Sequence, residues 1–122
     1  MDLGGEESHA MIEEGLGVLE RLDHRGARGA EPNTGDGAGI LLQKPHDFFR
    51  TVVSGLGEFD AYGVGQFFLP PDESVQPALR DFIDRRVQAE GFETIAWRDV
   101  PTDASELGPT ARATEPDVWQ LF

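Results

Sequence analysis

The spacing of apolar residues along the chain alternates between helical and extended periods. In residues 8–23 and 74–90 apolar side chains recur every three or four positions, which is typical of amphipathic helices. Shorter apolar runs bounded by glycine or proline are typical of strands. The pattern predicts helices over residues 8–23, 46–53 and 74–90, strands over residues 40–42, 61–69, 92–97 and 118–122, and a loop over residues 99–116. With no internal repeat or linker, this order predicts one α+β domain.

Capping residues define the expected ends of the two longest helices. Ser8 is the expected N-cap of the helix over residues 8–23, and Gly91 is expected to end the helix over residues 74–90. Pro77 is compatible with that second long helix only in its first turn, because proline lacks an N–H. This constraint favours Ser74 over Asp72 as its cap.

The last apolar run, residues 118–122, is expected to expose large side chains or a sheet edge unless another segment covers it. Trp97 and Trp119 are expected to be core or edge-strand aromatics rather than a stacking platform for nucleic acid. With 39% hydrophobic residues and eight phenylalanines, the 122-residue chain is not a disordered polar tract. It has neither an apolar run of membrane-spanning length nor a basic-then-apolar leader, so we expect a cytoplasmic protein without a membrane partner.

The formal net charge of −13 argues against nucleic acid as a partner, because phosphate binding requires clustered Lys and Arg. Lys44 is the single lysine. An acidic surface that uses arginine in place of lysine is favoured in concentrated salt, which screens the self-repulsion of like charges. A halophilic source and a merely acidic mesophile are both consistent with this composition.

The absence of cysteine excludes disulfides, thiolate-bound zinc and iron–sulfur clusters within these residues. His9 and His46 have no second histidine or carboxylate at ligand spacing, so no metal site is predicted.

A glycine-rich loop over residues 26–39 is the most distinctive feature of the chain. A phosphate cradle is not favoured, because such glycines follow a strand and open onto a helix, whereas these precede an expected strand. The loop also carries Asp36 and no lysine, so a phosphate would meet the wrong charge.

The strings HRGA (residues 24–27) and TGDGAGILLQKP (residues 34–45) resemble the start of the glutamine amidotransferase domain of glutamate synthase, large subunit. The strings WRDVPT (residues 97–102) and LG (residues 107–108) resemble the same family at the expected distance downstream. The likeness implies that residues 1–122 are an incomplete class II amidotransferase domain. Its fold would be part of a four-layer α-β-β-α sandwich of the N-terminal-nucleophile hydrolase type.

Members of this family attack the carboxamide of glutamine with an N-terminal cysteine, whose free α-amino group serves as the base. The ammonia passes to a second domain, where it combines with 2-oxoglutarate and electrons arrive through FMN and an iron–sulfur cluster. The resemblance therefore implies a role in glutamate biosynthesis and ammonia assimilation, with the remaining glutamate synthase domains or subunits as partners. It implies no cofactor for these residues themselves.

The sequence departs from the family where the nucleophile is expected. Residues 1–7 contain neither a cysteine nor an apolar strand to carry it, so we expect no catalytic residue and no glutaminase activity in the isolated chain. One hypothesis is a truncated or split subunit that binds glutamine only when completed. The alternative is a non-catalytic scaffold or regulatory module that associates with other glutamate synthase subunits.

By resemblance, Arg25 and Gly26 of the His-Arg-Gly motif lie beside the nucleophile, and Asp36 is adjacent to them. Arg25 has a second interpretation as a loop-bracing residue paired with Asp23 or Asp36. Asp36 either orients Arg25 or caps the glycine loop. For His24, capping the end of the first helix is favoured over catalysis.

If the acidic surface is an adaptation to salt, molar KCl will raise the melting temperature, because screening weakens the repulsion among 23 acidic side chains. Thermal unfolding followed by circular dichroism between dilute buffer and molar KCl measures this. Sorbitol at matched osmolarity is the control for excluded-solute effects. A melting temperature that does not rise with KCl would contradict the halophilic hypothesis.

Overall fold

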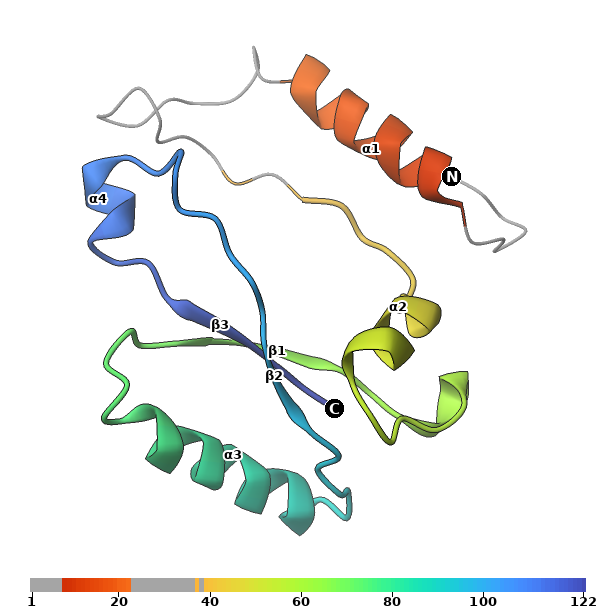
Figure 1. Cartoon of the computed structure of the whole chain (residues 1–122), viewed down its shortest axis with the longest axis vertical. Coiled ribbons are helices and arrows are strands. Elements are labelled where there is room, and N and C mark those ends of the chain that lie inside the picture. The colour runs from red at the N-terminus through yellow and green to blue at the C-terminus, as the bar shows by residue number, and fades with distance from the viewer. Residues whose placement is uncertain (1–7, 23–36, 38) are drawn as a thin grey trace. The chain divides into compact units, whose positions relative to one another are not determined.

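The computed structural model describes residues 8–22, 37 and 39–122, and the chain divides into two compact units, Met1–Leu42 and Gln43–Phe122. The described part of the first unit contains helix α1 (His9–Arg21), with Ser8 at its N-cap as predicted (Figure 1). No residue of α1 is buried in the described part, and its apolar stripe includes half-exposed Leu16 and Val18. Among the described residues, the apolar face of this amphipathic helix is therefore only partly covered.

The predicted strand over residues 40–42 is wrong. These residues form neither helix nor strand, and the Leu41 side chain is 100% exposed. An apolar run becomes a strand only when a neighbouring strand satisfies its backbone N–H and C=O groups. No described strand pairs with this segment, so its composition alone does not produce a strand.

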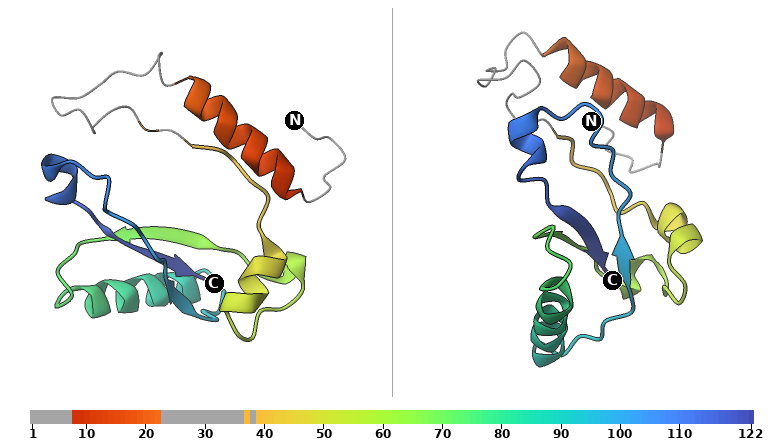
Figure 2. Two further views of the ribbon diagram at one scale, coloured as in Figure 1. Left: turned by 45° about the horizontal axis from the view of Figure 1, so that its top comes forward. Right: turned by 60° about the vertical axis from the view of Figure 1, so that its left-hand side comes forward.

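The second unit combines helices with a small sheet, which confirms the predicted α+β class (Figure 1). Its elements in order are α2 (His46–Val52), the 3-10 turn η2 (Phe59–Ala61), β1 (Gly65–Leu69), α3 (Gln76–Ala89), β2 (Trp97–Asp99), α4 (Pro109–Arg112) and β3 (Asp117–Leu121). Helix α3 lies along one face of the sheet (Figure 2). The segment between β2 and β3, which was predicted to be a loop, contains the short helix α4.

The three strands form an antiparallel sheet in the order β1-β3-β2. Trp119 of β3 is opposite Phe67 of β1 on one side and Asp99 of β2 on the other. The last apolar run is thus a strand, as predicted, but it lies in the middle of the sheet. Leu121 and Phe122 are buried rather than exposed, because both flanking strands and the core cover them.

Two predicted strands have different bounds in the structure. The prediction over residues 61–69 holds only from Gly65, because η2 ends at Ala61 and the segment before β1 has no pairing partner. The prediction over residues 92–97 is wrong for most of its length, since β2 begins at Trp97. Just before β2, the main-chain N–H of Ile95 donates to the Phe122 carbonyl. The position at which β2 begins is therefore determined by its pairing with the end of β3.

Helix α3 begins later than predicted. Its N-cap is Val75, so neither Ser74 nor Asp72 is the cap. The Asp72 carboxylate instead accepts hydrogen bonds from the main-chain N–H and hydroxyl of Ser74, which forms a turn before the helix. Pro77 lies in the first turn and Gly91 has φ +85° just beyond the C-terminus, both as predicted.

The core of the second unit is an aromatic cluster where α2 meets the end of β3. Phe49, Val53, Tyr62 and Phe122 are buried together. The rings of Phe49 and Phe122 meet edge to face with centroids 4.9 Å apart. This cluster ties helix α2 to the sheet.

Polar groups close the open side of the cluster around Tyr62. The Lys44 ammonium donates to the main-chain carbonyls of Phe59 and Tyr62 and lies 3.9 Å from the centroid of the Tyr62 ring. The Tyr62 hydroxyl lies 3.0 Å from Nδ1 of His46. The single lysine of the chain is therefore held among carbonyl oxygens and aromatic faces.

Burial raises the pKa of the Tyr62 phenol above its ordinary value of 10.0, and the positive charge of Arg50 offsets part of that rise. Because Tyr62 is the only tyrosine, absorbance at 295 nm reports its ionisation alone. We expect a titration midpoint above 10.0 in buffer that returns to about 10 in concentrated urea.

The same pKa shift links Tyr62 to stability. The folded state retains the phenolic proton more strongly, so its contribution is present below pH 10.0 and is lost as pH rises through the higher folded pKa. In Tyr62→Phe this part of the alkaline decline should disappear. An unchanged decline in Tyr62→Phe, or a midpoint at or below 10.0 in buffer, would contradict the burial of this phenol.

Candidate functional site

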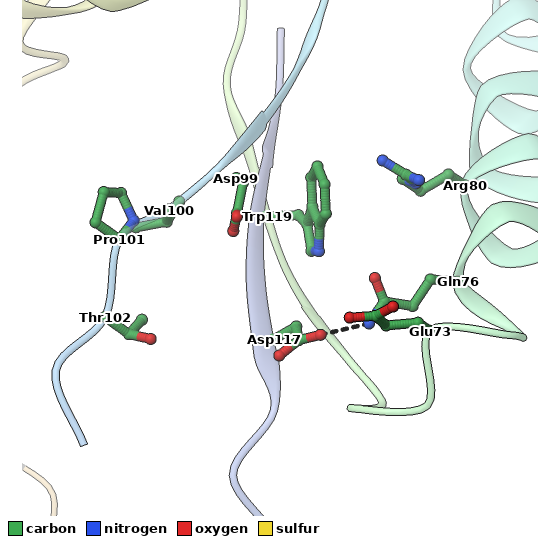
Figure 3. Close-up of a pocket in the computed structure, with 9 residues that line it drawn as sticks. All are labelled: Glu73, Gln76, Arg80, Asp99, Val100, Pro101, Thr102, Asp117 and Trp119. Carbon is green, nitrogen blue, oxygen red and sulfur yellow. Dashed lines mark hydrogen bonds between the residues drawn. The ribbon is translucent and has the colours of Figure 1, made fainter.

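A cavity of about 510 Å³ lies between helix α3, strand β3 and the segment that follows β2. We call it the α3–β3 pocket. Figure 3 draws the nine residues that line it, and the side chains of Arg80, Gln76 and Glu73 project from the α3 side toward those of Asp117 and Trp119 on β3. Charged and aromatic side chains from three segments far apart in the sequence thus converge on one cavity.

Gln76, in the first turn of α3, anchors the pocket. It is only 4% exposed, and its Nε2 donates to the Pro70 carbonyl at 2.9 Å and to the Asp117 carboxylate. A buried amide needs such partners because burial removes its hydrogen bonds to water. The Asp117 carboxylate is consequently held in place at the beginning of β3.

Trp119 forms the wall of the pocket on the sheet side. The guanidinium carbon of Arg80, one turn beyond Gln76, lies 4.3 Å from the centroid of the indole ring, a cation–π contact. The indole Nε1 is buried and has no hydrogen-bond acceptor among the described residues. Its end of the ring points toward Asp117 and Gln76 (Figure 3).

The charges in the pocket are mixed but unpaired. Glu73, Asp99 and Asp117 contribute three carboxylates, and Arg80 contributes one guanidinium. Within the described part of the chain, Arg80 forms no ion pair with any of them. The lining contains no histidine or cysteine, so its titratable groups are these three carboxylates and the Arg80 guanidinium.

The opposite face of the sheet carries a polar row across all three strands. Arg98 of β2 donates to the Gln120 side chain on β3 at 2.7 Å, and Gln120 donates to Gln66 on β1 at 3.2 Å. The Arg98 guanidinium also lies 5.5 Å from the Phe48 ring centroid. These hydrogen bonds fix the strands in register on the face that α3 does not cover.

The two tryptophans are sheet residues, as predicted. Trp97 is partly buried, its Nε1 donates to the Asp84 carboxylate of α3 at 3.0 Å, and its ring centroid lies 5.2 Å from that of Phe67. Asp84 also accepts from Thr94, so this carboxylate joins the middle of α3 to the start of β2.

The site residues predicted from the sequence, Arg25, Gly26 and Asp36, and also His24, lie outside the described residues. The remaining histidines have local partners: His9 lies 3.5 Å from Glu13, a carboxylate four residues along the helix that the sequence-based prediction did not count, and His46 contacts Tyr62. Across residues 8–22, 37 and 39–122, no group of His, Asp or Glu could hold a metal ion. In the same residues, no helix is long and apolar enough to cross a membrane.

Sequence reasoning missed the α3–β3 pocket. In the sequence, Arg80 and Gln76 are ordinary polar positions of an amphipathic helix. Asp117 lies 41 residues from Gln76, so their hydrogen bond leaves no local pattern in the sequence. The local signal was the alternation of Asp117 and Trp119, which places both side chains on the same face of β3. That face could not be connected to α3 before the strand order was known.

The family model for class-II glutamine amidotransferases matches residues 1–122. The chain therefore belongs to the class-II glutamine amidotransferases. Its relatives include the glutamate synthase [NADPH] large chain of Bacillus subtilis, 37% identical over 122 residues, and ferredoxin-dependent glutamate synthase 1 of Arabidopsis thaliana, 34% identical over 119 residues. The glutamate synthase [NADPH] large chain of Azospirillum brasilense is 34% identical over 124 residues.

These alignments cover 98%, 94% and 98% of the chain, and 8%, 7% and 8% of the respective relatives. They confirm the predicted resemblance to the amidotransferase domain of glutamate synthase. That prediction was based on the strings HRGA, TGDGAGILLQKP and WRDVPT. The chain thus spans less than a tenth of the length of the curated relatives that it matches.

The role of Gln76 can be tested by Gln76→Leu, which preserves the approximate size of the side chain and removes its hydrogen bonds. We expect the free energy of unfolding to fall by about 1–3 kcal/mol, because the Pro70 carbonyl and the Asp117 carboxylate lose their donor. Urea unfolding followed by tryptophan fluorescence measures this. Gln88→Leu, on an exposed position of the same helix, should change it by less than about 0.5 kcal/mol. Equal effects of the two substitutions would show that Gln76 has no anchoring role.

Proposed function

We propose that these 122 residues are part of the glutamine amidotransferase domain of a glutamate synthase and do not hydrolyse glutamine by themselves. The observation that supports the proposal is the family match across residues 1–122. In addition, all the relatives reported above are glutamate synthases. The α+β architecture of the second unit is compatible with a portion of a four-layer α-β-β-α sandwich. On this proposal, residues 1–122 are an incomplete domain.

The proposed chemistry belongs to the completed enzyme. There a cysteine thiol attacks the carboxamide of glutamine, and the α-amino group of that cysteine accepts the proton. Ammonia leaves, water releases glutamate from the acyl-enzyme, and the ammonia together with two electrons from the enzyme's reductant converts 2-oxoglutarate to glutamate. No cysteine occurs in residues 1–122, so the nucleophile has to come from elsewhere. The proposed setting of this reaction is ammonia assimilation in the cytoplasm.

FMN and an iron–sulfur cluster are the cofactors that the family implies for the full enzyme. The residues present do not fit a cluster: thiolates are absent from the sequence, and the described part contains no group of alternative ligands. The proposal therefore assigns both cofactors to other domains or subunits. Its partners are these remaining parts of glutamate synthase, and glutamine only when the domain is complete.

Within the proposal, Arg25 and Gly26 lie beside the nucleophile of the completed site, and Asp36 orients Arg25 or caps the loop. A guanidinium at that place would bind a carboxylate or stabilise negative charge near the thiol. The support is the match of the HRGA string to the family, in a chain that aligns with it throughout. A loop-bracing role for Arg25 is the competing proposal.

The isolated chain should release no ammonia from glutamine above a blank without protein, because it lacks the group that forms the acyl intermediate. The assay couples ammonia to NADH oxidation by glutamate dehydrogenase, with a glutamate synthase of known activity as the positive control. Turnover above the blank that survives repurification of the chain would refute the proposed inertness.

A scaffold role is distinguished from a split enzyme by reconstitution. The chain is co-expressed with a glutamate synthase from which the matching segment, apart from its cysteine strand, has been deleted. Recovery of glutaminase activity would support a split catalytic domain. Stable association without recovery would support the scaffold, and no association would contradict both.

A further inference from the structure

We propose that residues 57–61 form a strap that the Lys44 ammonium holds closed against Tyr62, and that this strap opens locally while the sheet stays folded. The proposal goes beyond the amidotransferase role and does not depend on it. It rests on an unburied, glycine-bounded segment whose contacts with the rest of the second unit converge on one cation.

The strap is the tip of the connection between α2 and β1. All five of its residues are exposed, and Phe59 in the middle retains 41% of its accessible surface. Tyr62, the residue that follows, is buried in the aromatic cluster. Within the strap, the Ala61 N–H donates to the Glu58 carbonyl at 2.9 Å. A turn without a buried side chain gains little from the hydrophobic effect, and such segments open at a low free energy.

Glycines at the base of the strap permit its closed shape. Gly55 has φ +84°, and a Cβ atom added to Gly57 would lie 3.1 Å from the Cβ of Ala61. The chain therefore folds back closely on itself at Gly57. Because glycine loses more backbone freedom than other residues when it is ordered, the closed shape is entropically costly. Another interaction has to offset that cost.

The Lys44 ammonium supplies this interaction. It donates to the carbonyl of Phe59, where the strap's 3-10 turn begins, and at 2.8 Å to the carbonyl of Tyr62, just after the turn ends. It also lies 4.4 Å from the ring centroid of Phe59 and 3.9 Å from that of Tyr62. Charge-assisted hydrogen bonds and cation–π contacts thus join the exposed strap to a buried residue through a single side chain.

The backbone of Lys44 is fixed to the beginning of α2. The His46 N–H donates to the Lys44 carbonyl at 2.9 Å, and the N–H of buried Phe49 donates to the Pro45 carbonyl at 3.0 Å. The ammonium is therefore presented from a firmly packed base. Since the strands pair with one another and not with the strap, release of the ammonium frees the strap and leaves the sheet intact.

The test measures amide hydrogen exchange in the 15N-labelled chain by NMR. The Ala61 amide reports the strap, and the Phe122 amide, which donates to the Ala96 carbonyl at 2.9 Å, reports the sheet. Lys44→Met keeps an unbranched side chain and removes the charge. It should raise the exchange rate of Ala61 about tenfold or more and leave that of Phe122 unchanged. Arg85→Met, on an exposed position of α3, changes the net charge equally and should alter neither rate.

Chemical rescue separates the cation from the packing of its side chain. In Lys44→Ala, propylammonium replaces the missing atoms and should slow the exchange of Ala61 saturably, because it restores a donor to the two carbonyls. Propan-1-ol at the same concentration and sodium chloride at the same ionic strength should not. Phe59→Leu removes one ring and keeps both carbonyls, so it should raise the rate by a smaller factor and keeps the test valid if the Lys44 variants do not fold.

Three results would overturn the proposal. An Ala61 amide that exchanges as fast in the native chain as in an unfolded peptide would show that the strap is not closed. Equal acceleration of Ala61 and Phe122 in Lys44→Met would show that the ammonium stabilises the whole unit rather than the strap. Rescue by propan-1-ol as effective as that by propylammonium would show that packing, not charge, holds the segment.

Discussion

The backbone pairing of β3 is the constraint on which the second unit depends. This strand is hydrogen-bonded to β1 on one side and to β2 on the other, and β1 and β2 do not pair with each other. The Phe122 main chain continues the pairing by exchanging hydrogen bonds with Ala96, and its ring enters the aromatic core. The sheet, the core and the wall of the α3–β3 pocket are therefore all built on one segment of the chain.

Helices were more predictable than strands for a physical reason. The apolar spacing of α1 and α3 is a local property, and so are the helix-start and helix-end signals of Pro77 and Gly91. Such signals can be recognised in the sequence without knowledge of the fold. Strand bounds depend on which partner is available: Leu41 lies in an apolar run and pairs with nothing described, whereas β2 begins only alongside β3. The side-chain turn between Asp72 and Ser74 likewise displaced the start of α3, because it satisfied the Ser74 N–H before the helix began.

The candidate site was less predictable than the fold. Family motifs identified the class, but their residues around Arg25 fall outside the described part, so the sequence and the structure inform different regions of the chain. The α3–β3 pocket has no motif at all. It exists because strand order places Asp117 and Trp119 against one turn of a helix that is distant in sequence, and no local pattern encodes that meeting.

The position of Lys44 has a consequence for covalent modification. Its amine is bound by two main-chain carbonyls and lies over the rings of Phe59 and Tyr62. Acylation would change the net charge by only one unit in a chain already at −13, yet it would remove the hydrogen-bonding cation from the aromatic cluster. Lysine acylation would therefore act on this protein through its packing far more than through its charge.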